Sequence, residues 1–135
     1  MVNDIYNSAR ESFLKGEINW LTNDIKAVLV NADLYTPDLG SHKFLTDIPV
    51  ISRVATSGNL TGKTADFGIA DARDITLTSV FGADADYIVV YQDTGNQSTS
   101  RLITYIDSAS GLPITPNGGD ITVQWPNGPF KIFRL

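Results

Sequence analysis

Few residues of this chain are suited to chemistry at neutral pH. Its 135 residues contain no cysteine and one histidine, His42. Histidine and cysteine are the usual sources of a general base or an activated nucleophile near pH 7. The acidic residues form no cluster at metal-ligand spacing. These residues favour binding over catalysis, so we expect no enzyme activity, no metal and no cofactor.

Asp93-Thr94-Gly95 is the segment that comes closest to a catalytic motif, and it follows the apolar run Ile88–Tyr91. Aspartic proteases place this tripeptide at a strand end, where two carboxylates share one proton. Because the chain holds one copy, the pair would have to come from a homodimer. Asp, Gly and Asn are also the residues that form turns. We interpret 93–96 as a turn, with the shared-proton site as the alternative.

Three other segments resemble known binding motifs, but each lacks a feature that its motif requires. Gly58–Thr64 has one residue too few between its glycines for a phosphate-binding loop, and no helix is predicted after it. The acidic segments 71–74 and 84–86 lack the spacing of a calcium-binding EF-hand loop. We interpret the first as a hairpin turn and the other two as solvated loops. His42 is interpreted as a surface or turn histidine.

Charge and hydropathy argue against two classes of partner. The net charge is −5, and the ten Lys and Arg residues are scattered without forming a basic stripe. A nucleic-acid partner is therefore not expected. No apolar run approaches the ~20 residues of a membrane span, and the polar start Met1–Asp4 does not resemble an export signal. We expect a protein made in the cytoplasm with no membrane partner.

Residues 4–15 are the one segment with a helical pattern. Apolar side chains recur on one side as far as Phe13, and Asn3 or Asp4 is suited to cap the first turn. Gly16 offers a left-handed stop. A helix of three turns is marginal alone, so it must dock on its own sheet or on a neighbouring subunit.

From Asp24 onward the pattern predicts strands. The predicted strands are 25–30, 50–56, 59–64, 75–81, 87–91, 100–106, 121–125 and 130–135. About seven or eight short strands at this spacing are typical of a β-sandwich or barrel. The long polar connection 31–49 includes a possible helical turn at 41–47. We therefore expect a mainly β protein with one domain over 1–135 and an N-terminal docking helix.

The short helix and the apolar C-terminal strand both need surfaces to cover them. Tryptophan also buries a large area. These arguments select the candidate interface or core residues, which are Tyr6, Arg10, Phe13, Trp20, Phe130, Ile132, Phe133 and Leu135. On this interpretation, removing residues 1–16 is expected to weaken attachment and leave the β domain folded.

Over nearly its whole length the chain resembles a family of small virion structural proteins of tailed bacteriophages. The segments that carry the resemblance are Glu11–Trp20, Asp24–Val30, Arg53–Gly58, Asp93–Gly95, Ser98–Ile103 and Gly111–Val123. None of them is a catalytic motif. The resemblance implies a component of the phage particle.

The expected function is that of a capsid decoration, or cement, protein that binds and stabilises the major capsid lattice. Its expected partners are the major capsid protein and copies of itself, as a homo-oligomer within the virion, after synthesis in the host bacterial cytoplasm. One alternative is a tail or neck component, such as an adaptor, tube or fibre-base protein. The other is a carbohydrate-binding module that contacts the host surface.

Overall fold

The computed structural model describes residues 4–107, 109, 112–126 and 131–135. The protein is mainly β with one α-helix, as the sequence predicts. The strands are β1 (Asp4–Ile5), β2 (Ile25–Val30), β3 (Arg53–Thr56), β4 (Ile69–Ala70), β5 (Ile75–Leu77), β6 (Tyr87–Gln92), β7 (Leu102–Ile106), β8 (Ile121–Val123) and β9 (Phe133–Arg134). The helix is α1 (Asn7–Leu14), and three 3₁₀ turns are η1 (Leu45–Asp47), η2 (Val50–Ser52) and η3 (Asp66–Gly68).

A five-stranded antiparallel sheet, in the order β1-β7-β6-β2-β3, forms the centre of the molecule. Its longest pairing joins β2 to β6, with Ile25 opposite Gln92 and Val30 opposite Tyr87. Apart from Lys26 in β2 and Gln92 in β6, these two strands consist of aliphatic residues and tyrosines, and nearly all of their side chains are buried. Such runs indicate strands covered on both faces.

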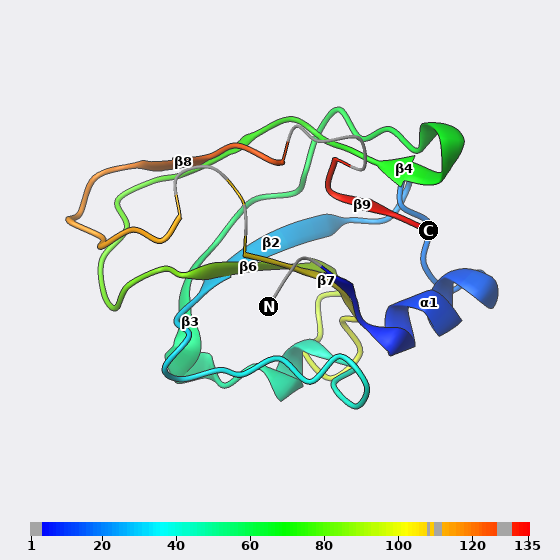
Figure 1. Ribbon diagram of the computed structural model, residues 1–135, viewed down its shortest axis with the longest axis horizontal. Coiled ribbons are helices and arrows are strands. Elements are labelled where there is room, and N and C mark those ends of the chain that lie inside the picture. Colours follow the sequence, from blue (N-terminus) through cyan, green and yellow to red (C-terminus); the bar gives the residue numbers. More distant parts are fainter. Residues whose placement is uncertain (1–3, 108, 110–111, 127–130) are drawn as a thin grey trace.

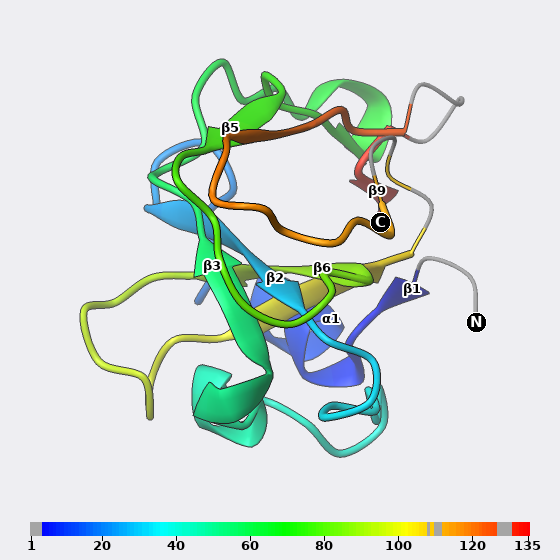
Figure 2. The same cartoon turned by 90° about the vertical axis from the view of Figure 1, so that its left-hand side faces the viewer.

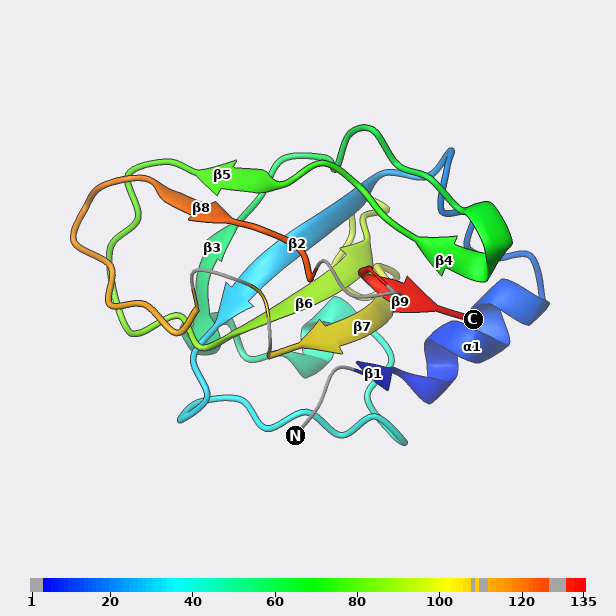
Figure 3. The same cartoon turned by 45° about the horizontal axis from the view of Figure 1, so that its top comes forward.

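Two layers cover this sheet. The two-stranded sheets β4-β9 and β5-β8 lie over one face, and the 31–52 segment lies under the other (Figures 1 and 2). Helix α1 lies at one end of the sheet and contacts β7, near β9 and the C-terminus (Figure 3). The core therefore runs through both sides of the central sheet.

The N-terminal segment differs from the prediction of a helix over 4–15. Asp4 belongs to β1 opposite Tyr105, and Tyr6 donates its backbone N–H to Ile103, so 4–6 extend the sheet. The helix begins at Asn7, with Tyr6 at the N-cap position and no side-chain cap. Asp4 is therefore not the cap, and Asn3 lies outside the described residues. Because Tyr6 and Ala9 are fully buried, the segment is part of the core, and removing residues 1–16 would damage the fold.

Most predicted strands form, with shorter bounds. Those at 25–30 and 87–91 are confirmed, and 75–81 ends early because Ser79 adopts a left-handed backbone. The predicted strand 50–56 begins with η2. The prediction for 59–64 was wrong: Gly62 turns the chain at φ 63°, and Leu60 instead donates its N–H to Ile25 beside the sheet.

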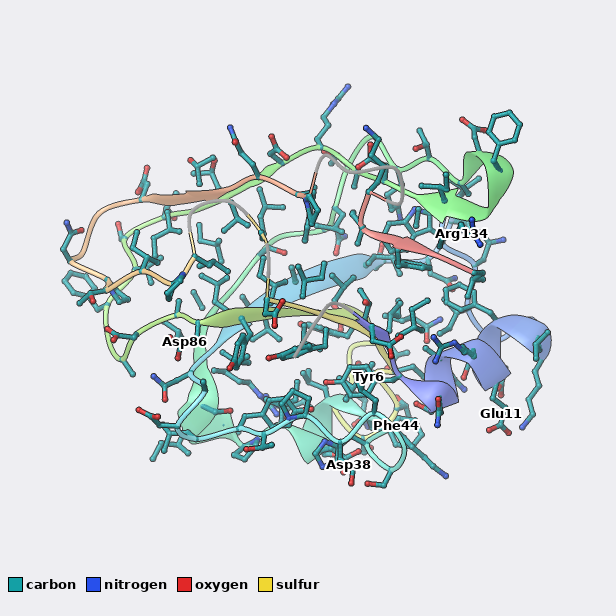
Figure 4. The ribbon with its side chains drawn as sticks, viewed as in Figure 1. Tyr6, Glu11, Asp38, Phe44, Asp86 and Arg134 are labelled. Carbon is teal, nitrogen blue, oxygen red and sulfur yellow. The ribbon has the colours of Figure 1, made fainter. Side chains whose placement is uncertain are left out.

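The 31–49 connection is fixed to the core by three aromatic side chains. The Tyr6 and Tyr35 hydroxyls lie 2.7 Å apart, and the Tyr35 hydroxyl lies 3.0 Å from His42 Nδ1. Nδ1 also accepts the Asp38 backbone N–H at 3.1 Å. Figure 4 shows Tyr6 between the sheet and the segment that carries Asp38. His42 therefore holds a turn, as the sequence predicts. The helical turn predicted in this connection forms as η1.

Candidate binding groove

An apolar groove of about 310 Å³ opens at the end of the molecule where α1, the 18–21 segment, η3–β4 and β9 meet. This is the right-hand end of Figure 1. We call this feature the groove. Phe13, Trp20 and Phe133 line it from three separate elements, and Leu21 and Leu135 line it with them. Among the described residues, none that lines the groove has a charged side chain.

Three aromatic rings fix the shape of the groove. The Trp20 and Phe133 rings meet edge to face, with centroids 5.2 Å apart, and the Phe13 and Phe133 centroids are 5.8 Å apart. Edge-to-face pairs are worth roughly 0.5–1.5 kcal/mol beyond the area they bury. Gly16, at φ 72°, ends the helix and lets the chain double back toward Trp20. Two of these three rings, Trp20 and Phe133, are buried core side chains.

The indole N–H of Trp20 is buried and has no acceptor among the described residues. Leaving a buried donor unpaired costs about 1–3 kcal/mol. By contrast, the Trp125 N–H donates to the Arg73 carbonyl at 2.8 Å. The Trp20 ring thus packs against its neighbours without a side-chain hydrogen bond among the described residues.

Large apolar side chains are exposed along and beside the groove. Leu21 and Leu135, which line it, are 53% and 59% exposed. Leu14, next to Phe13 in the chain, is 89% exposed, and Phe67, next to Gly68 of the groove wall, is 97% exposed. We call these four residues with the groove the apolar face. Leu21 and Leu135 give the groove an exposed apolar rim, and exposed apolar surface of this kind marks interaction sites.

Phe67 is also strained. Its backbone has φ 57° and ψ 29°, and Gly68 follows at φ 74°. The left-handed conformation costs a non-glycine residue roughly 1–2 kcal/mol. A strained and exposed phenylalanine contributes nothing to packing within its own chain.

The structure brings together four of the eight predicted interface or core residues. Phe13, Trp20, Phe133 and Leu135 all line the groove. Tyr6 and Ile132 are instead buried in the core. Arg10 forms an ion pair with Asp4 at 2.9 Å and donates to the Ile5 carbonyl. Phe130 lies outside the described residues.

Sequence reasoning missed Leu21 and Phe67. Leu21 follows Trp20 in a segment with no periodic pattern, and Phe67 stands alone among small and acidic residues. The only signal at Phe67 was the adjacent Gly68, which is typical of a left-handed turn. Its exposure had no signature in the sequence.

The Asp93 carboxylate serves the turn that the sequence predicts. One oxygen forms an ion pair with Lys26 at 2.8 Å, and the other accepts the Gly95 backbone N–H at 3.0 Å. The Lys26 ammonium, and then the Gly95 amide, hold the pKa of Asp93 below its ordinary value. The ion pair and the backbone amide both favour the charged form of this single carboxylate, and they account for its place in the turn.

The acidic loops also have structural partners. Asp74 accepts the Trp125 backbone N–H, and Asp86 accepts that of Ala32. Over the described part of the chain, no three His, Asp or Glu side chains lie close enough together to hold a metal ion. None of the described helices is long and apolar enough to cross a membrane.

Comparison of the chain with models of known protein families found no matching family, and comparison with curated proteins found no match.

Proposed function

We propose that this chain is a bacteriophage virion structural protein, most specifically a capsid decoration protein that binds the major capsid lattice and stabilises it. Two lines of support meet in this proposal. One is the sequence resemblance to small virion proteins of tailed phages. The other is the apolar face, whose chemistry suits contact with other protein subunits.

The apolar face is the observation that carries the proposal. Leu14, Leu21, Phe67 and Leu135 expose most or about half of their side chains at one end of the molecule. Exposing them to water costs roughly 25 cal/mol for each Å² of apolar surface that a partner could cover. Aromatic anchors beside well-packed pockets are the residues that dominate protein interfaces.

Repetition in a particle makes even a small face sufficient. A decoration protein is displayed in many copies on a lattice, and linked copies bind with an avidity well above that of one contact. A groove without charged side chains also limits repulsion between acidic chains, since this chain has a net charge of −5. The groove therefore suits a protein that works in an ordered array.

The test is the copy number and position of the chain in purified particles, measured by quantitative mass spectrometry and electron cryomicroscopy. Decoration predicts hundreds of copies on the outer shell. A ring of about a dozen copies at the neck or tail would refute decoration and favour the tail or neck alternative. Absence from finished particles would refute both.

Binding to shells that lack the protein gives a second test. The double variant Leu21→Ser/Leu135→Ser removes two exposed groove side chains, and Val50→Ser/Ile51→Ser removes two exposed apolar side chains of η2. We expect the groove variant to lower occupancy at least ten-fold. Equal occupancy for wild type and groove variant would rule out attachment that depends on the groove, and binding to a glycan array instead would favour the carbohydrate-binding alternative.

A further inference from the structure

We infer that the groove is occupied by a second copy of this chain, in a two-fold dimer in which Phe67 of each copy enters the groove of the other. This inference rests on the proposed assembly role of the apolar face and names its immediate partner. The decorating unit would then be a pair of chains.

Phe67 has the properties of an anchor for another protein. It is the most exposed of the large hydrophobic side chains in the described residues, at 97%. It stands on two consecutive left-handed residues, Phe67 and Gly68, which direct it away from its own chain. Asparagine or glycine would fit this backbone with less strain. A phenylalanine here is explained by a contact that the isolated chain does not make.

The groove has the size and chemistry to accept this side chain. An apolar cavity of about 150 Å³ holds a benzene ring, and the groove has about 310 Å³. The Trp20 and Phe133 rings in its wall offer edges and faces to a third ring. Its lack of charged side chains excludes a site built for a phosphate or an acidic peptide.

The placement of anchor and groove suits two-fold symmetry. Gly68 lines the groove, and Phe67 precedes it, so the anchor stands one residue from the wall of its own groove. In a two-fold interface the same patch serves both copies, and each anchor faces the partner's groove. The pairing closes after two copies and leaves no further groove open.

The area available predicts a weak dimer. The four exposed side chains of the apolar face, covered in both copies, amount to on the order of 1,000 Å² in total, the lower limit for a specific interface. Interfaces of this size are weak or transient. The dimer is therefore expected to be concentration-dependent in solution and to gain strength on the lattice through avidity.

Sedimentation equilibrium of the isolated chain over a wide concentration range tests the dimer. We expect a monomer–dimer equilibrium that Phe67→Ala weakens at least ten-fold. Ile51→Ala, which removes an apolar side chain 75% exposed on η2, is the matched control and should leave the equilibrium unchanged. A chain that stays monomeric at millimolar concentration would overturn the inference, as would a dimer that Phe67→Ala leaves intact.

Because the chain has no cysteine, introduced cysteines report the pairing without background. The Leu21→Cys copy keeps its own Phe67, so a mixed dimer with Phe67→Cys retains one of the two anchors. At concentrations high enough to offset the loss of the other anchor, we expect this mixture to give a disulfide between copies on mild oxidation. A disulfide needs Cα atoms within about 7 Å, so it reports direct contact. If Phe67→Cys instead joined Ile51→Cys, Phe67 would contact η2 of the other copy and not its groove, and the proposed dimer would be wrong.

These measurements separate the two proposals. A dimer in solution with no copies in purified particles would refute the decoration role and keep the dimer. If particles carried the chain as single copies and the chain were also monomeric in solution, the dimer would be refuted and the decoration role would stand.

Discussion

The central sheet and the groove end of this molecule use apolar residues in opposite ways. In β2, β6 and β7 nearly every side chain is buried, and residues such as Ile88 and Ile103 are fully covered. At the groove end, β4 and β9 pair over two residues each, and Leu14, Phe67 and Leu135 face solvent. The first region is complete within one chain. The second has more apolar surface than its own chain covers.

This difference separates stability from binding. Buried aliphatic strands with long pairings supply most of the free energy of folding, and short peripheral elements open at lower cost. Substitutions in the sheet should therefore unfold the protein, and substitutions on the apolar face should leave it folded and change only association. Four predictions test the contrast, from the largest expected effect to the smallest.

The largest effect is expected in the central sheet. Ile88→Ala removes a fully buried side chain from β6 and should lower the free energy of unfolding by about 3 kcal/mol, through lost transfer energy and a cavity. Leu135→Ala, at a groove side chain 59% exposed, should change it by less than ~0.5 kcal/mol. Urea denaturation followed by tryptophan fluorescence measures both. Equal losses for the two variants would contradict the contrast.

The buried tyrosines predict a loss of stability at alkaline pH. Burial raises the pKa of Tyr6 well above its usual range and raises the pKa of Tyr35 to about 12. An unfolded chain loses these protons near pH 10, so above that pH the unfolded state binds fewer protons than the folded state. Stability should therefore be fully present below pH ~10 and fall by roughly 1.4 kcal/mol per pH unit for each buried phenol.

The variant Tyr6→Phe isolates one of these groups. It should lower the free energy of unfolding by about 1 kcal/mol at pH 7, because it removes the hydrogen bond to Tyr35. Between pH 10 and ~11.5 its free energy of unfolding should fall less steeply than that of wild type, by the roughly 1.4 kcal/mol per pH unit that one buried phenol contributes. Parallel curves for the two proteins over this range would show that Tyr6 ionises freely in the folded state.

The same contrast explains how much the sequence could predict. The run 87–91 is apolar throughout and 25–30 is apolar except for Lys26, and segments of that length and composition have few stable alternatives to a covered strand. The predicted strand 59–64 does not form, because a strand needs a distant pairing partner and because Gly62 turns the chain. The local sequence pattern contains neither piece of information. Local pattern also cannot separate residues 4–6, which add to the sheet edge, from the helix that follows.

The sequence predicted some of the groove residues and not others, for a related reason. Phe13, Trp20, Phe133 and Leu135 could be selected as large apolar residues in short terminal elements, and they meet in the groove. Tyr6 and Ile132 have the same character and lie in the core. The type of residue indicates that an apolar side chain tends to be buried. Only the fold determines whether its own chain or another chain buries it.

A smaller effect is expected at the turn after β6. Asp93→Asn removes the ion pair with Lys26 while keeping an acceptor for the Gly95 amide, and should cost about 0.5–1 kcal/mol at pH 7. Because the folded pKa of Asp93 is lowered, its contribution is present above pH ~4 and disappears as pH falls further. Stability curves of wild type and variant should therefore converge as the pH falls from ~4 through the lowered folded pKa of Asp93. A difference that stays constant as the pH falls would show that the charge has no role.

The smallest effect has the opposite sign and lies at Phe67. Asparagine tolerates the left-handed backbone better than phenylalanine, so Phe67→Asn should stabilise the isolated chain by about 0.5 kcal/mol. The same change removes the proposed anchor, so it should abolish the dimer in sedimentation equilibrium. A variant that gains stability and loses association would show that the strain at this position is retained for the partner. If Phe67→Asn lost stability as a monomer, the side chain would instead belong to the fold of its own chain, and the division between the sheet and the apolar face would have to be drawn elsewhere.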